Sequence, residues 1–325
     1  MLSTTAQPRA DLDLVVMGHV QTSAQFAQNR IFPVKAVPKK TGRYWKIKPG
    51  TLLRAPTTKR APSSKYKRDT YDLEDATFSV TGKGLEGQCS QEQIAEFGDV
   101  LGLEAARSVQ KVNQILRREE VDLAATLFSR TTFPVAAATG HDAINEWDDH
   151  SNATPVDEVL TAVEAIRGNI GDFKSMGLQV CAAMNYRTAR HCKLCTQVRS
   201  GLGGVYTRSE FAAADIHDAL LAEALEVDEV IVTDSRYQSA GTVASPTVSK
   251  IWDDEYCLIF VRADPNAPEF MGLGLTFCWN EFGGEYEVRS YDEPQTSSRV
   301  VQVNRSSTQE IIQTGAGYLI GNLKT

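Results

Sequence analysis

Apolar residues recur at three- and four-residue steps up to Phe128, which is the spacing of one helix face. The residues that follow this spacing are Val109, Val112, Leu116, Leu123 and Leu127. Ser90-Gln91-Glu92-Gln93 precedes them and is typical of a capping box, with Ser90 as the N-cap. The pattern predicts one long helix with a charged band, Arg117 to Glu120, in its middle. About 26 helical residues would span roughly 40 Å, a length that suits a strut.

Helical and strand-like patterns alternate in the middle of the chain. Thr154 is a candidate N-cap, Pro155 would occupy the first helical position, and Gly168 is the predicted stop. Val159, Leu160, Val163 and Ile166 would form the buried face of this helix. Further helices are expected at 186–194 and 211–225, and strands at 178–183, 230–233 and 256–261. This alternation is typical of α/β layers.

From Gly272 onward the pattern has the period of two that predicts strands. Leu275, Phe277 and Trp279 alternate with smaller residues. Short strands are also expected at 286–291, 300–303 and 318–320. The fold class is therefore α+β, with an α/β middle and a β-rich end.

The first 89 residues carry few periodic apolar positions. Residues 1–34 read as a polar, irregular arm, and the apolar stretch 12–20 is too short for a bilayer and lacks a preceding positive cluster. Residues 35–89 read as a long two-stranded hairpin, with strands at 43–48 and 76–81. In the first strand Trp45 and Ile47 would share one face. A hairpin with so few apolar residues is not stable alone, so it must lie on another surface.

The charge distribution separates this hairpin from the rest of the chain. Between Lys35 and Arg68 there are 12 basic residues and no acidic one. Removing those 12 charges from the net charge of −7 leaves −19 on the other 291 residues. The chain thus joins one positive arm to an acidic body, and that overall balance argues against a general nucleic-acid coat.

The basic arm has three interpretations. Its cations would neutralise nucleic-acid phosphates, with Tyr44 or Trp45 stacking on bases. Alternatively they would lie over the acidic body of another copy of the chain, or they would simply be solvated. The charge asymmetry favours contact with another copy. The candidate intersubunit residues are Trp45, Lys46, Lys48, Arg54, Lys59, Arg60, Lys65, Lys67 and Arg68.

The sequence offers little for catalysis. Gly82-Lys83-Gly84 and Gly201-Leu202-Gly203-Gly204 lack the spacing of a phosphate-binding loop. His191-Cys192-x-x-Cys195 has no second ligand pair for zinc, and scattered cysteines fit reduced thiols. Two Trp-Asp-Asp sequences, at 147–149 and 252–254, have no visible catalytic partners. We therefore expect no enzyme activity, no metal and no cofactor.

The order of these parts resembles the major capsid proteins of tailed double-stranded DNA bacteriophages, which have the Hong Kong 97-like (HK-97) fold. Short sequence segments support the resemblance over about residues 30 to 322. The similar segments are Ile31 to Pro38 with Gly42 to Lys46, Arg118 to Phe128, Asn145 to Pro155, Trp279-Asn280, Val288 to Glu293 and Gly317 to Ile320.

The resemblance implies a division into four parts: an N-terminal arm (1–34), an extended loop (35–89), a peripheral domain with a spine helix (90–154 and 270–325), and an axial domain (155–269). It also implies a structural, self-assembling protein of the virion. Copies would form hexamers and pentamers of an icosahedral capsid, assembled in the bacterial cytoplasm around double-stranded DNA held non-specifically on the inner face. Portal and decoration proteins would be further partners, and no membrane is involved.

About 34 residues precede the loop, so we expect that scaffolding is supplied by a separate protein or is not needed. Two other functions stay open from the sequence. One is a soluble nucleic-acid-binding protein that uses the basic arm. The other is an encapsulin-like nanocompartment shell, which would enclose enzymes rather than DNA.

Overall fold

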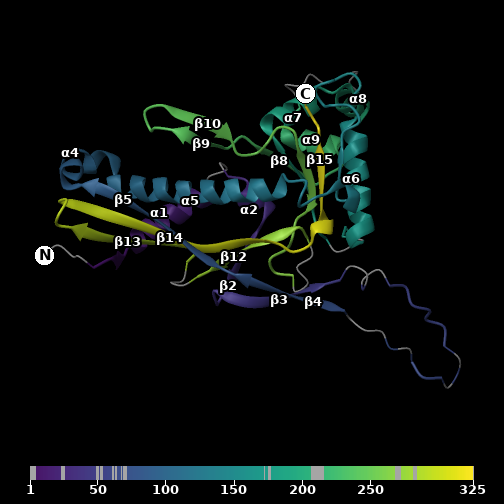
Figure 1. The fold of residues 1–325 in the computed structure, drawn as a ribbon, viewed down its shortest axis with the longest axis horizontal. Coiled ribbons are helices and arrows are strands. Elements are labelled where there is room, and N and C mark those ends of the chain that lie inside the picture. Colours follow the sequence, from purple (N-terminus) through teal and green to yellow (C-terminus); the bar gives the residue numbers. More distant parts are fainter. Residues whose placement is uncertain are drawn as a thin grey trace.

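The computed structural model describes residues 5–22, 26–48, 51, 54–60, 62, 64–66, 68, 72–171, 173–174, 177–205, 216–267, 272–280 and 284–324. Figure 1 shows a long helix lying along one sheet, a second sheet flanked by helices at one end, and a hairpin that leaves the body on the other side of the first sheet. The α+β class predicted from the sequence is confirmed.

The first sheet collects strands from both ends of the chain. Its order is β1-β13-β14-β12-β2, and β5 also pairs with β14. The strands are β1 (Gln7–Pro8), β2 (Val34–Val37), β5 (Thr81–Ser90), β12 (Gly274–Trp279), β13 (Tyr286–Glu293) and β14 (Ser298–Ile311). β14 pairs antiparallel with β5, β12 and β13, so it is the strand that joins this sheet together. The sequence pattern predicted β12 and β13 well but only a short piece near the start of β14, and it missed β5.

The predicted strut helix is divided in two. α4 (Gln91–Leu101) and α5 (Leu103–Leu127) are separated by Gly102, whose φ of +51° is left-handed. Ser90 belongs to β5, and its hydroxyl accepts a hydrogen bond from the Glu92 amide at 3.3 Å, as the predicted cap requires. The 25 residues of α5 span about 37 Å along the first sheet (Figure 1).

The second sheet is covered by helices from the middle of the chain. Its strand order is β6-β15-β11-β7-β8. The strands are β6 (Gly140–Asp142), β7 (Val180–Asn185), β8 (Glu229–Thr233), β11 (Cys257–Val261) and β15 (Gly317–Gly321). The helices are α6 (Pro155–Ile170), α7 (Tyr186–Leu194), α8 (Thr196–Val205) and α9 (Asp218–Ala224), with 3₁₀ turns at Val135–Ala137 and Thr314–Ala316.

Most predicted elements of this middle section are confirmed, within a few residues. The α6 helix runs past Gly168 to Ile170, and its C-cap is Gly171, whose φ is +86°. The helix expected at 211–225 begins only at Asp218, as α9, because the backbone of His217 is extended and serves as its N-cap. Residues 211–215 lie outside the described residues. The core of this region includes Trp147 and Trp252, both with no exposed surface.

Two hairpins complete the fold. β3 (Thr41–Ile47) pairs with β4 (Leu73–Ser79), as the sequence predicted. β9 (Arg236–Gly241) pairs with β10 (Pro246–Lys250), a hairpin that the sequence reading missed. No helix in the described ranges is both long enough and apolar enough to cross a bilayer.

The expectation of an irregular arm at residues 1–34 is wrong. The segment contains α1 (Ala10–Thr22) and α2 (Gln28–Ile31). Leu12 and Val16 are buried against Val112 and Leu116 of α5. The helix escaped detection because apolar residues such as Leu14 also lie on its exposed side, so no clear apolar stripe is visible in the sequence.

Candidate intersubunit interface

The β3–β4 hairpin is attached to the body through aromatic packing at its base. The Phe78 ring stacks on Phe277 of β12 with ring centroids 4.6 Å apart, and Tyr44 packs on Phe277 at 5.3 Å. Val80 and Leu275 belong to the same buried cluster. The prediction that the hairpin lies on another surface is therefore confirmed at its base.

The two faces of β3 differ in burial, as expected for side chains that alternate along a strand. Tyr44 is buried, whereas the neighbouring Trp45 keeps 53% of its surface exposed. Lys46 points back toward the body, where its Nζ lies 3.4 Å from the Ile312 carbonyl oxygen. Trp45 is thus available to a partner, and Lys46 is largely committed to the chain's own fold.

The positive charge of the hairpin is partly neutralised within the hairpin. Acidic residues follow the basic run and fall on the return strand or just before it. Three ion pairs result: Arg54–Asp72 at 2.9 Å, Arg43–Asp75 at 3.3 Å and Lys46–Glu74 at 3.5 Å. These pairs are exposed in part and contribute little stability. Arg43, Lys46 and Arg54 of the predicted positive arm are therefore neutralised by carboxylates of the same chain.

Apart from Lys35, Lys39 and Lys40, which precede β3, the remaining cations lie in the segment that connects β3 to β4. Arg60 lies over the Tyr66 ring, 4.2 Å from its centroid. Among the described residues, the exposed side chains of Lys48, Lys59, Lys65 and Arg68 form no ion pair. Lys67 lies outside the described residues. Figure 1 shows the described part of this segment extending away from the body, where another molecule has access to it.

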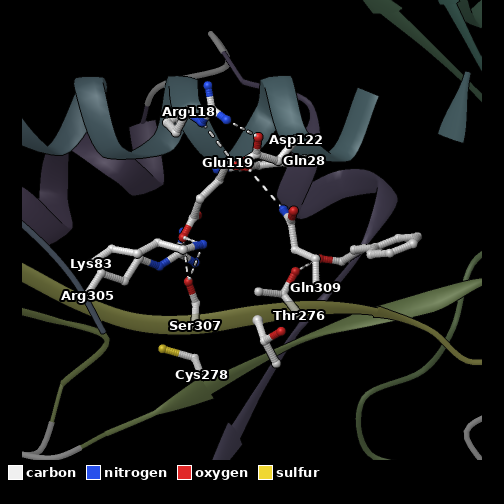
Figure 2. A network of polar contacts seen from close by, with 12 residues as sticks. Gln28, Lys83, Arg118, Glu119, Asp122, Thr276, Cys278, Arg305, Ser307 and Gln309 are labelled. Atoms are coloured by element: carbon white, nitrogen blue, oxygen red, sulfur yellow. Dashed lines mark hydrogen bonds and ion pairs between the residues drawn. The ribbon is translucent and has the colours of Figure 1, made fainter. Parts of the chain in front are cut away.

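A buried ionic cluster fixes the long helix to the first sheet (Figure 2). Glu119 of α5 and Arg305 of β14 form an ion pair with neither side chain exposed. Lys83 of β5 approaches the same carboxylate at 2.8 Å, and the Ser307 hydroxyl donates to it. The charged band predicted on this helix is thus partly interior, which the sequence did not reveal.

Glu120, the next residue, joins the long helix to the middle of the chain. Its Oε1 accepts hydrogen bonds from the Trp252 indole at 2.7 Å and from the Ala27 amide at 3.2 Å. Burial raises the pKa of Glu120 above its ordinary value. The Trp147 indole likewise donates a hydrogen bond to the buried Glu158 carboxylate at 2.9 Å. In both Trp-Asp-Asp sequences the tryptophan therefore binds a buried glutamate.

The polar groups considered for metal binding have structural roles. Asp254 is buried beside Lys250, with Arg187 at 3.6 Å and Lys324 at 3.7 Å. His191 pairs with His150 at 3.1 Å. All six cysteines are buried thiols, and burial raises the pKa of Cys195 to about 12, which makes it a poor nucleophile. No cluster of metal-ligating side chains occurs within the described ranges.

Comparison with known proteins finds similar structures but no similar family or curated sequence. No protein-family model and no curated protein sequence matches the chain. A phage-related protein from Bordetella bronchiseptica superimposes with a TM-score of 0.68 at 20% identity, over 98% of both chains. The capsid of cyanophage P-SCSP1u superimposes with a TM-score of 0.56 at 8% identity, over 90% of this chain and 86% of that one.

A third similar structure is the mature capsid of bacteriophage PhiM1, with a TM-score of 0.52 at 9% identity, over 89% of this chain and 85% of that one. The chain has the Hong Kong 97-type capsid fold. The fold resemblance stated from the sequence is thereby confirmed. In the terms of that fold, α5 is the spine helix and the β3–β4 hairpin with its connecting segment is the extended loop.

Proposed function

We propose that this chain is the major capsid protein of a tailed double-stranded DNA phage. The observation that carries the proposal is the Hong Kong 97-type fold over nearly the whole chain, shared with the capsids of two phages. The role is structural: copies associate as hexamers and pentamers into an icosahedral shell, and no catalytic centre is required.

The extended loop is the part that we propose to contact a neighbouring copy. Lys48, Lys59, Lys65 and Arg68, which form no ion pair within the described residues, extend from the body on a hairpin with an aromatic base. The rest of the sequence carries the opposite charge. Attraction between loop and neighbour would steer the approach of subunits and set their register, and salt would weaken it.

The four-part division made from the sequence becomes part of this proposal. The arm, the loop, the peripheral domain and the axial domain would occupy 1–34, 35–89, 90–154 with 270–325, and 155–269. β5 is assigned to the loop in this division, yet it pairs with β14 over ten positions. The part of the loop that we propose to reach a neighbouring copy is therefore 41–79, and β5 anchors it to the peripheral sheet.

The other partners follow from the same role. Packaged double-stranded DNA would contact the inner face without sequence preference, and scaffolding, portal and decoration proteins would bind the shell. Assembly would take place in the cytoplasm of the host bacterium, and the product would belong to the virion.

Electron microscopy of the purified full-length chain, with sedimentation velocity beside it, tests the proposal. Uniform closed shells, formed alone or with a co-expressed scaffolding protein, are the expected result. Shells that enclose host enzymes and are never filled by a packaging machine would favour a nanocompartment. A small species that binds free DNA with a steep salt dependence, and forms no shells, would contradict the proposal.

A further inference from the structure

The β9–β10 hairpin projects from the body with both of its faces in solvent. Residues 238–248 are all exposed, without a break. A strand that packs one face on a body buries every second side chain, because successive side chains point to opposite faces. The unbroken run of exposed residues therefore means that the described part of this chain covers neither face of the hairpin.

The hairpin nevertheless has a shape that its own contacts define. Gly241 has a φ of +86°, and a Cβ at this position would clash with the Ser245 carbonyl oxygen, so the turn requires glycine. The backbones of Thr242 and Ser245 exchange hydrogen bonds at 3.3 and 3.2 Å. Across the strands, the Ser239 and Ser249 hydroxyl oxygens lie 2.7 Å apart. A preformed hairpin of this kind loses little conformational freedom when it docks.

The composition of the hairpin differs from that of an ordinary solvated surface. No charged residue occurs from Tyr237 to Ser249, whereas about 25–35% of the surface residues of a soluble protein are typically charged. Val243 keeps 94% of its surface exposed and Val248 keeps 54%. Strands that stay in solvent usually carry charges that discourage association. This composition is that of a surface which another molecule covers.

The chemistry of the hairpin narrows the kind of partner. Between Arg236 and Lys250 there is no cation to neutralise phosphates, which supply most of the affinity for nucleic acid. Addition of a strand to its edge is also disfavoured, because Pro246 begins β10 and the pairing register shifts between Thr247 and Val248. The hairpin therefore suits side-chain contact with the surface of a protein.

The direction of the hairpin favours a lateral neighbour. Figure 1 looks down the shortest axis of the molecule and shows the hairpin extending sideways, on the side of α5 opposite the first sheet. A flat subunit in a shell lies with its shortest axis across the wall, so a sideways projection meets the next copy of the same chain. DNA and decoration proteins would approach along the shortest axis instead.

We propose that the β9–β10 hairpin is a second, uncharged docking arm, which packs Val243 and Val248 against a neighbouring copy of this chain. The inference rests on the proposed function, since a shell supplies such a copy at every position. The two arms then differ in their physics. Charge on the extended loop steers the approach and is weakened by salt, whereas apolar contact at this hairpin is insensitive to salt.

Thiol labelling of a Val243→Cys variant of the full-length chain tests the proposal. All six native cysteines are buried, so the introduced thiol is the accessible one. A maleimide should label it quickly in the unassembled chain and at least about tenfold more slowly in shells, because reactivity follows exposure.

Photocrosslinking identifies what covers the hairpin. A benzophenone is attached to the introduced thiol, and shells are assembled from a mixture of isotope-labelled and unlabelled copies. Crosslinked peptides that join the two kinds of copy, found by mass spectrometry, are the expected result. Crosslinks only to DNA, to a scaffolding protein or to a decoration protein would overturn the assignment of the partner.

Two further substitutions at the same position separate docking from folding. Because Val243 is almost fully exposed, Val243→Asp and Val243→Ile should both keep the melting temperature of the unassembled chain. Val243→Asp places a carboxylate in the apolar contact and should lose assembly, whereas Val243→Ile keeps the contact and should form shells.

The outcomes distinguish this inference from the proposed function. Normal shells from Val243→Asp, or an introduced thiol that is equally reactive in shells and in the unassembled chain, would overturn the docking arm and leave the capsid role standing. Protection in a small closed oligomer would support the arm and contradict the shell. A chain that never associates would overturn both.

Discussion

Glu119 of the spine helix and Arg305 of β14 form an ion pair in which neither side chain has exposed surface (Figure 2). Lys83 and Ser307 bind the same carboxylate, and Arg305 also contacts Glu285. The cluster connects β5, β14 and α5, which come from distant parts of the sequence. It fixes the position of α5 over the sheet and the rotation of α5 about its own axis.

Breaking this pair from one side should be costly. Arg305→Met leaves the buried Glu119 carboxylate with too little positive charge, and we expect a loss of about 3–5 kcal/mol in the free energy of unfolding. Urea denaturation of the unassembled chain measures it. Arg118→Met, which breaks the exposed pair with Asp122, should cost less than about 1 kcal/mol. Equal losses in the two variants would contradict a structural role for the cluster.

Glu120 should make stability depend on pH. Its pKa is raised in the folded chain, so the folded state holds a proton that the unfolded state releases first. The free energy of unfolding therefore falls as the pH rises above the ordinary value of 4.5 and through the raised pKa. Glu120→Gln should gain stability relative to wild type over that window, as measured by urea denaturation from pH 4 to 8. A difference that does not change with pH would contradict this prediction.

The hairpin should detach when its aromatic base is removed. Phe78→Ala deletes the ring that stacks on Phe277, and a buried Phe→Ala change costs about 3 kcal/mol or more. We expect faster hydrogen exchange in β3 and β4 than in β14. Thr77→Ala, on the exposed side of the same strand, is the control and should change exchange little. Unchanged exchange in Phe78→Ala would show that other contacts hold the hairpin.

Two glycines should respond in opposite directions to alanine. Gly168 lies within α6 and has open space around it, so Gly168→Ala should stabilise the chain by about 0.5–1 kcal/mol. Gly102 has a φ of +51°, so Gly102→Ala should destabilise it by about 1 kcal/mol. Thermal unfolding of both variants checks the signs. A stabilising Gly102→Ala would mean that α4 and α5 can join into one helix.

The loop cations should be needed for assembly and not for folding. Changing Lys48, Lys59, Lys65 and Arg68 to Glu reverses charges that have no ion-pair partner within the described residues. We expect a monomer with wild-type circular dichroism and melting temperature that forms no shells by electron microscopy. Exchanging Lys and Arg at the same positions keeps the charge and should preserve shells. Normal shells from the glutamate variant would refute electrostatic docking of the loop.

Regular periodicity made much of the fold readable from the sequence. Pro155 after Thr154 marked the start of α6, and the alternation around Phe277 marked β12, because these signals depend only on neighbouring residues. The long hairpin was recognised from the alternation at 43–48, and its few apolar residues indicated that it lies on another surface. The order of such elements, together with short similar sequence segments, was enough to predict the capsid fold.

Tertiary structure alone decided which charged residues are interior. Arg117 to Glu120 looks like one solvated band, yet Glu119 and Glu120 are buried because Arg305, Lys83 and Trp252 reach them from distant strands and loops. The same applies to the candidate interface. Lys46 is held by the body and Arg54 by Asp72, whereas Lys48 and Lys59 stay exposed. Sequence determined where the cations occur, and long-range pairing decided which of them remain for a partner, because ion pairs depend on distances that the chain's order does not specify.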